Sequence, residues 1–327
     1  MKHFGSRVSL CKTKSKNLND HVWIKQVSEN KKHCEQVHKV TNLYKARLLQ
    51  EYKKPNSKQT TFISWKFPAT GQIGKHCGLW KYVGCDNHEH KAHQGKTLVR
   101  KFKTSCKKAE CPECWYSWVN RESFRSTKRF ENYERVKQEH GYRKPKLIHV
   151  IFSPPWNEKF SRYDVIKKKL RELCKEAGII GGLAVYHAFA NPKSENPKDW
   201  VLRPHFHILG YGWLKPTNGK NKIDRKGWVI KNKGIREKTF GTISYLLTHC
   251  AIAKKVHSVF WFGELGYRAK YASEIRVEDD TLESKLCQFC GMMLKELIFV
   301  GSIDPPPDIE FEALLNPKYW KAVVNGS

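Results

Sequence analysis

Acidic residues are scarce in this sequence. Its 327 residues include 31 Asp and Glu against 61 Lys and Arg, which gives a formal net charge of +30. A small domain needs a net charge of only about 2–8 for solubility, and a surface of one sign repels itself unless a polyanion neutralises it. We therefore expect nucleic acid to be the natural partner.

Long apolar runs are also missing. No stretch of about 18 consecutive apolar residues occurs, so we expect no transmembrane helix and no membrane partner. The basic start, residues 1–20, is not followed by an apolar segment, which argues against a secretory signal. Both absences favour a cytoplasmic, reducing location. There, the eleven cysteines are expected to be free or metal-bound rather than paired in disulfides.

The residues that are present indicate a folded α+β core. Hydrophobic residues make up 39% of the chain and aromatic residues 12%, which is enough for a substantial core. Local patterns predict strands at 146–152, 181–189, 204–213 and 256–263, and helices at 161–178 and 239–252. The order β-α-β-β-α-β with short links predicts an antiparallel sheet with a ferredoxin- or RRM-like layout.

Composition divides the chain into four parts, with no internal repeat. Before the core, a long basic helix is predicted from Trp115 to a stop near Gly141, and a short helix is possible at 43–54. We expect a basic N-terminal segment (1–60), a zinc-binding module with the basic helix (61–145), the core (146–263) and a small C-terminal appendage with a C-x-x-C knuckle (264–327).

Two histidines stand at alternate positions of one predicted strand, LRPHFHILGYGW. His205 and His207 share a face of that strand, while Phe206 points into the core. Two neighbouring imidazoles are half of a metal site, although two satisfied surface histidines would give the same pattern. His187, on the preceding strand, can face the same point and is our candidate for a third ligand.

A tyrosine follows on a predicted helix, in the segment GTISYLLTH. Tyr245 lies 38 positions after His207, and His249 is one helical turn further on the same face. A helical tyrosine is by default a core residue. Here Ile243, Leu246 and Leu247 can supply the core, which leaves Tyr245 free to face the sheet or its edge.

The cysteines form two half-sites typical of zinc. In CKKAECPECW, Cys106, Cys111 and Cys114 need a fourth ligand for a tetrahedral set; we favour Cys85, with His88 as the alternative. Cys287 and Cys290 in CQFCG form a second C-x-x-C, whose partners the sequence does not reveal. A redox role is the rival, but no thioredoxin-like context surrounds either pair.

Taken in order, three segments resemble the motifs of the HUH endonucleases, in particular the rolling-circle replication initiators. HVIFSPP resembles the first motif, PHFHILGYGW the second and ISYLLTH the third, and with the CPECW segment the chain looks closest to archaeal plasmid and viral initiators. The resemblance covers about residues 106–263. Many relatives carry lysine three residues after the tyrosine; position 248 is threonine, and His249 can take its place.

The resemblance implies a reaction. Mg²⁺ or Mn²⁺, held by His205, His207 and a third ligand, polarises a phosphodiester of single-stranded origin DNA. The tyrosine attacks phosphorus, which leaves a 5′-phosphotyrosine and a free 3′-OH for later rejoining. The partners would be origin DNA with its flanking duplex, on a plasmid or viral genome, and a host polymerase. The chain has no G-x-x-x-x-G-K-S/T motif, so a separate helicase would unwind the duplex.

Two other functions remain open at this point. A transposase or relaxase of the same superfamily would be favoured by a second tyrosine soon after Tyr245, but none occurs before Tyr267. A zinc-bearing DNA-binding regulator without chemistry would share the charge and the cysteines. An enzyme of the superfamily would form a covalent adduct with single-stranded DNA, whereas the regulator would not, so this adduct distinguishes the two functions.

Overall fold

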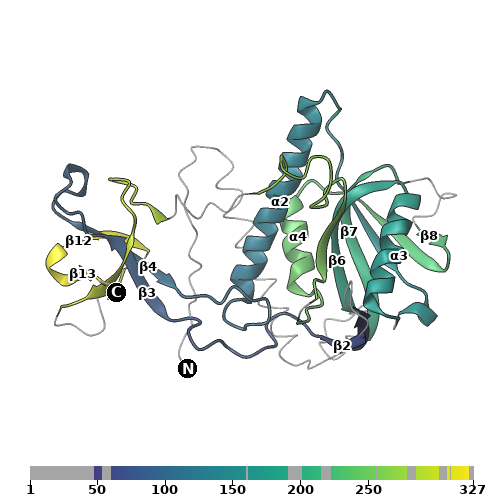
Figure 1. The fold of residues 1–327 in the computed structure, drawn as a ribbon, viewed down its shortest axis with the longest axis horizontal. Coiled ribbons are helices and arrows are strands. Elements are labelled where there is room, and N and C mark those ends of the chain that lie inside the picture. Colours follow the sequence, from purple (N-terminus) through teal and green to yellow (C-terminus); the bar gives the residue numbers. More distant parts are fainter. Residues whose placement is uncertain are drawn as a thin grey trace. The chain divides into compact units, whose positions relative to one another are not determined.

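The structure is a computed structural model that describes residues 48–53, 60–159, 161–190, 201–214, 222–254, 256–277, 285–301, 308–309 and 311–323. The described residues form two compact units. The first unit comprises 74–106 and the described residues from 285 to 323, and the second comprises those from 48 to 73 and from 107 to 277 (Figure 1).

The second unit is built on a six-stranded antiparallel sheet of order β10-β6-β7-β5-β9-β8. All strands and helices predicted for the core are present, with an added hairpin, β8–β9, before the last helix. The strands are β5 (Ile148–Ser153), β6 (Ile179–Ala190), β7 (Val201–Gly212), β8 (Lys222–Arg225), β9 (Trp228–Ile235) and β10 (Val259–Gly263). The α+β class with an antiparallel sheet is thus confirmed.

The strand order differs from the expected layout. In a ferredoxin-like sheet the last strand borders the first, whereas here β10 borders β6. On the side away from β7, β5 pairs with β9, a strand of the added hairpin. β7 therefore lies at the middle of the sheet, paired with β6 on one side and β5 on the other.

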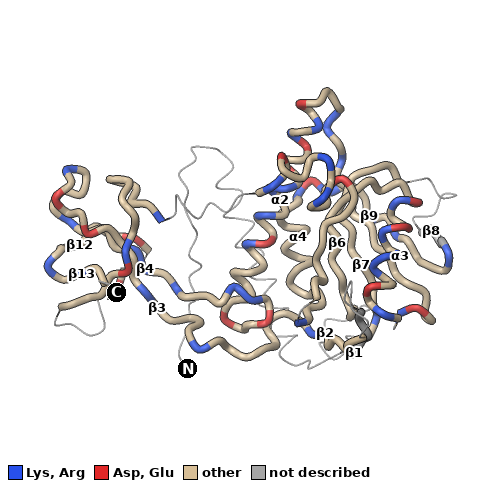
Figure 2. Tube along the Cα trace, in the orientation of Figure 1, with Lys and Arg blue, Asp and Glu red and all other residues tan. Residues whose placement is uncertain are grey.

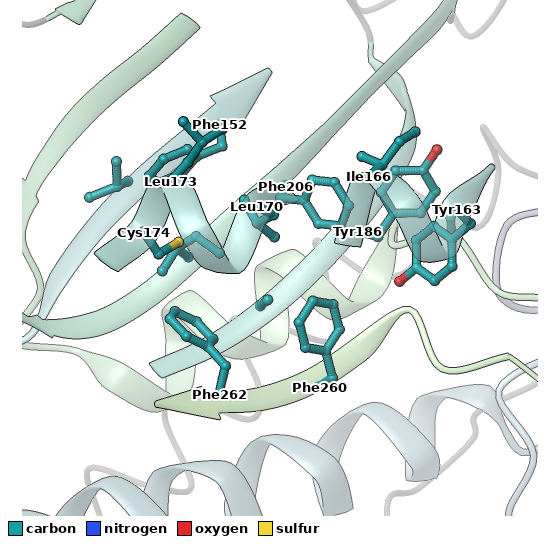
Figure 3. Packing of buried hydrophobic residues seen from close by; sticks show 14 of the residues in the cluster. Phe152, Tyr163, Ile166, Leu170, Leu173, Cys174, Tyr186, Phe206, Phe260 and Phe262 are labelled. Atoms are coloured by element: carbon teal, nitrogen blue, oxygen red, sulfur yellow. The ribbon is translucent and has the colours of Figure 1, made fainter. Parts of the chain in front are cut away.

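One face of this sheet is covered by helix α3 (Tyr163–Glu176). Tyr163, Ile166, Leu170 and Leu173 recur at helical spacing and are all buried. They pack on inward-facing strand residues, including Phe206, in the largest apolar cluster of the unit (Figure 3). The buried side chains described on this face are mainly apolar.

Helices α2 (Trp115–Glu139) and α4 (Thr239–Thr248) cover the other face (Figure 1). The basic helix ends as predicted near Gly141: its last residue is Glu139, two residues before this glycine, which has φ +78°. Small residues let the two helices approach closely: Ser244 of α4 donates a hydrogen bond of 2.9 Å to Ser123 of α2. This face carries the polar residues of the candidate site.

A two-stranded sheet, β1 (Leu48–Lys53) and β2 (Thr60–Trp65), precedes the core. The short helix predicted at 43–54 is wrong for 48–53, which pairs with β2 as a strand; the rest of it lies outside the described residues. The reason is tertiary, because Trp65 of β2 is buried against Tyr163 and Tyr186. That packing holds β2 in place as the partner of β1.

The first unit is a five-stranded sheet of order β12-β4-β3-β11-β13. Its strands are β3 (Trp80–Cys85), β4 (Thr97–Lys103), β11 (Lys295–Phe299), β12 (Glu312–Leu315) and β13 (Trp320–Ala322). The predicted boundaries of a zinc module and a separate appendage are therefore wrong. The C-terminal strands pair with β3 and β4 and complete their sheet.

Three short 3-10 helices complete the described elements, at Lys91–His93, Trp156–Glu158 and Pro317–Tyr319. Within the described residues, no helix is both long and apolar enough to cross a membrane. Lys and Arg positions run along α2 and α3, as Figure 2 shows.

Candidate functional site

The three histidines predicted as metal ligands lie together on one face of the six-stranded sheet. His187 of β6 stands opposite His205 of β7, and His207 follows two residues along β7. Phe206, between them, joins the apolar cluster under α3, so the histidines face the other way. One ring nitrogen of each histidine lies within 4.8 Å of those of the other two. These three residues, the histidine group, can hold a metal ion.

His187 tests whether this group fits a metal. Its side chain is buried, and Nε2 lies 3.1 Å from the Leu246 carbonyl oxygen. Only a protonated nitrogen can bond a carbonyl, so Nε2 carries the proton and Nδ1 keeps its lone pair. Nδ1 is buried without a hydrogen-bond partner in the protein. An unsatisfied buried acceptor is costly, and a cation shared with His205 and His207 would satisfy it.

A fourth histidine, His149 of β5, adjoins the group. Its Nε2 lies 2.8 Å from His207 Nδ1, and its Nδ1 accepts from the Arg236 guanidinium at 3.3 Å. His149 lies in HVIFSPP and was not among the predicted ligands. The alternation of side chains along β5 could have indicated a role for His149. It puts His149 on the same face as Ile151, which stands opposite His207.

Hydrogen bonds link these rings in one direction. Arg236 donates to His149 Nδ1, so the proton of His149 sits on Nε2 and is donated to His207 Nδ1. His207 then donates from Nε2 to His205 Nε2, at 3.2 Å, and His205 donates from Nδ1 to the Arg203 carbonyl oxygen, at 2.6 Å. A metal at His207 Nε2 requires the opposite tautomer, with the proton on Nδ1 and His149 Nε2 as its acceptor.

Burial keeps these imidazoles neutral. Desolvation lowers the pKa of His149 and of His205 to about 4, and it lowers the pKa of His187 and of His207 well below the ordinary value. Neighbouring positive groups act in the same direction, as Arg236 does on the pKa of His149. Neutral imidazole is the form that ligates metals, so protonation does not compete with metal binding at neutral pH.

Tyr245 lies on α4 beside this group. It is 47% exposed, while Ile243, Leu246 and Leu247 of the same helix are fully buried and supply its core face. The Tyr245 ring centroid is 4.8 Å from that of His249, which is 4.5 Å from that of His187. A row of three rings thus leads from an exposed phenol to a candidate metal ligand.

Thr248, at the position where lysine was expected, orients His249. Its hydroxyl donates to the Tyr245 carbonyl oxygen at 2.7 Å and lies 3.1 Å from His249 Nδ1. The single hydroxyl proton is used on the carbonyl, so His249 Nδ1–H must donate to Oγ1, and Nε2 keeps the lone pair. His249 therefore retains one proton-accepting nitrogen in a ring that contacts Tyr245.

A second ligand group lies within the first unit and joins two distant segments of the chain. Cys85, His93, Cys287 and Cys290 have ligand atoms within 4.8 Å of one another. Cys85 Sγ is 3.5 Å from Cys290 Sγ, and Cys287 Sγ is 3.2 Å from His93 Nε2. Three sulfurs and one imidazole are a complete donor set for zinc. We refer to these four residues as the Cys/His group.

Local hydrogen bonds hold the Cys/His group in a ligating arrangement. His93 Nδ1 lies 3.2 Å from the Lys96 carbonyl oxygen, which places the proton there and leaves Nε2 for a metal. On the other side, Cys287 Sγ accepts from the Phe289 amide at 3.4 Å. Gly291, with φ +71°, closes the turn after Cys290, a conformation that favours glycine.

This arrangement corrects the assignment of Cys85. The prediction that Cys85 completes a site with Cys106, Cys111 and Cys114 is wrong, because β3 pairs with β11 and so lies beside the segment that carries the C-terminal knuckle. Cys85 and His93 are instead the partners that Cys287 and Cys290 lacked. The signal was weak, since 194 residues separate His93 from Cys287.

Cys106 belongs to the first unit, whereas Cys111 and Cys114 directly precede helix α2 of the second. His88, the alternative ligand, belongs to neither group: it is exposed, with Nδ1 2.8 Å from the Asp86 carbonyl oxygen. None of the described cysteines forms a disulfide.

Comparison with known proteins found no relative: no protein-family model, no curated protein and no solved structure matches this chain. Its function has to be inferred from the chemistry of the site itself.

Proposed function

We propose that this protein is a metal-dependent nickase of single-stranded DNA, with Tyr245 as the nucleophile, that starts rolling-circle replication. The observation that carries the proposal is the combination of three neutral imidazoles on one sheet face with an exposed tyrosine one ring away from them. A purely structural histidine cluster would need no exposed phenol beside it. The order of the three motifs adds the resemblance to the initiators.

His187, His205 and His207 would hold the metal. A bound divalent ion supplies Lewis-acid polarisation of a phosphoryl oxygen at this point. Imidazole suits transition metals, of which Mn²⁺ binds nitrogen ligands most weakly but still better than Mg²⁺, which prefers oxygen ligands. The group contains no carboxylate among the described residues. The donor set therefore favours Mn²⁺ over Mg²⁺.

Tyr245 would carry out the covalent step. Its phenol oxygen attacks phosphorus and forms the O–P bond of a 5′-phosphotyrosine, while the bond from phosphorus to the 3′ oxygen breaks. The phenol proton passes to His249 Nε2, and the departing 3′ oxygen takes up a proton to become a free 3′-OH. Reversal of the same step rejoins the strand, so no external energy source is needed.

The charge of the chain supports DNA as the substrate. A net charge of +30 provides many phosphate contacts, which dominate nucleic-acid affinity. Since the sequence has no phosphate-loop motif, we propose that a separate helicase and a host polymerase act with this protein on a plasmid or viral origin inside the cell.

The test is formation of a covalent adduct. Wild-type protein, incubated with single-stranded origin DNA and Mn²⁺, should give a denaturant-resistant protein–DNA species and a free 3′-OH. Tyr245→Phe removes one exposed hydroxyl, so the fold and DNA binding should persist while the adduct disappears. The matched control is Tyr267→Phe, another exposed tyrosine. An adduct that survives in Tyr245→Phe, or that is absent from the wild type, would refute the assignment; the latter outcome favours a non-catalytic DNA-binding regulator.

We also propose that the Cys/His group holds a structural zinc ion. The first unit has a small core centred on Val99, Leu297, Ile309 and Trp320. Small cores often need a metal or disulfides to be stable. Zinc at these four ligands would tie the C-terminal segment to the segment that carries β3.

A further inference from the structure

A pocket of about 520 Å³ opens in the second unit at the end of β5, where the SPP part of HVIFSPP forms a turn. The nicking reaction does not use this pocket. Its lining includes Trp156 and Lys159 after the turn, Arg203 of β7 and Lys231 of β9. Its volume falls within the range of ordinary small-ligand sites.

The pocket shares the sheet face of the histidine group. Arg203 lies two residues before His205 on β7, where the pairing of β6 with β7 shifts register, and its place on this side follows from the pocket that it lines together with Lys231. Lys231 stands opposite Ile151, which in turn stands opposite His207, so all three project from one face. The pocket is thus next to the point where a scissile phosphate would bind.

Three positive side chains line the pocket without acidic partners. Lys159, Arg203 and Lys231 form no ion pair with any carboxylate that the structure describes. Burial and the neighbouring Arg203 lower the pKa of Lys159. Like charges this close repel each other, and an anion between them would relieve the repulsion.

Trp156 adds an aromatic surface. It is 70% exposed although the turn that carries it is well anchored: Glu158, two residues on, accepts a hydrogen bond of 3.0 Å from Trp228 Nε1 and pairs with Lys169. Lys159 lies 4.2 Å from the centre of the Trp156 ring. A fixed, exposed indole beside cations is the arrangement on which unpaired bases stack.

We propose that this Trp156 pocket binds one nucleotide of single-stranded DNA next to the scissile phosphate. The base stacks on Trp156, and the phosphate is held by Lys159, Arg203 and Lys231. The identity of the strand rests on the proposed nicking function, but the binding chemistry does not. The pocket would fix which phosphate reaches His205 and His207, and so determine the register of the cut.

Binding is measured separately from nicking. All variants carry Tyr245→Phe and are kept in chelator, so that no cleavage occurs. The probe is a fluorescent single strand of about ten nucleotides, a length that one binding domain can cover, and the readout is anisotropy. Trp156→Ala should weaken binding by about fivefold or more, as expected for loss of one stacked base. The matched control, Trp213→Ala, removes another exposed tryptophan of this unit, beyond the other end of β7, and should leave affinity unchanged.

A second pair of variants tests the cations. Arg203→Ala should weaken binding more than Lys168→Ala, which removes an equal charge from α3, on the opposite face. On a duplex of the same sequence, where bases are not free to stack, Trp156→Ala should have no effect. Equal losses in each variant and its control, or an equal loss on duplex, would overturn the proposal.

The two proposals can fail independently. If wild-type protein forms no adduct but Trp156→Ala still weakens strand binding selectively, the pocket stands and the nicking function falls. If the adduct forms but Trp156→Ala and Trp213→Ala bind alike, nicking stands and the pocket proposal falls. Thermal unfolding of each variant confirms that folding is unchanged.

Discussion

The two ligand groups within single units of this chain differ in kind. In the first unit, three sulfurs and one imidazole close a set of four donors, with Cys85, His93 and Cys287 almost fully buried. In the second unit, three imidazoles leave the set incomplete, and a half-exposed tyrosine lies one ring away. Structural metal sites are closed, while catalytic sites keep an open position. On this ground we propose a stabilising role for the first group and a chemical role for the second.

Loss of a histidine ligand should have the largest effect. His207→Ala removes the central ring of the histidine group, and we expect Mn²⁺-dependent nicking to fall to background while zinc content and DNA binding are retained. His205→Ala and His187→Ala should behave alike. The control is His257→Ala, an exposed histidine of the same unit. Nicking by His187→Ala at the wild-type rate would show that the third ligand lies elsewhere.

Loss of a cysteine ligand should have the opposite result: zinc is lost and nicking is retained. Structural zinc in small domains contributes about 10–16 kcal/mol, more than the total stability of many domains. Cys287→Ser should therefore release zinc and unfold the first unit, as seen by metal analysis and proteolysis, while nicking of a short single strand continues. The control is Cys174→Ser, a buried cysteine of α3 that belongs to neither group. Retention of zinc and of protease resistance in Cys287→Ser would contradict the structural role.

His149 should have an intermediate effect, confined to metal affinity. A metal at His207 Nε2 needs an acceptor for the Nδ1 proton, and loss of such a partner typically costs 10–100-fold in affinity. We expect His149→Phe to weaken Mn²⁺ binding by roughly that factor, measured by calorimetry without DNA. His149→Gln, which retains an acceptor oxygen, should restore part of the loss. Equal affinities in the two variants would mean that His149 acts only by packing.

Arg236 should have the smallest effect, in the opposite direction. Its donation to His149 Nδ1 favours the tautomer that opposes metal binding at His207. Arg236→Ala should therefore tighten Mn²⁺ binding roughly fivefold, equivalent to about 1 kcal/mol. The same titration measures it, with Arg268→Ala as the control for loss of charge. A weaker affinity in Arg236→Ala would show that the guanidinium supports the ligating geometry instead.

Local patterns determined much of the histidine face. The period of a strand is two, so His205 and His207 had to share a face once the segment was recognised as a strand. The helix carrying Tyr245 followed from spacing in the same way, because Ile243, Leu246 and Leu247 satisfied the core. The C-x-x-C knuckle at Cys287 needed only a short turn and a glycine. These features depend on neighbours within a few residues, which the sequence displays directly.

Only the tertiary structure decided which distant residues meet. Spacing favoured Cys85 as the fourth ligand of the set with Cys106, Cys111 and Cys114, but the pairing of β3 with β11 brings Cys85 to the C-terminal knuckle. His149 became a partner of His207 because β5 pairs with β7 rather than lying at a sheet edge. Strand pairing is set by the packing of a whole sheet, in which many weak contacts act together. No local sequence pattern contains the combined effect of these contacts. The sequence therefore determined which residues can donate to a metal, and the fold decided which of them lie together.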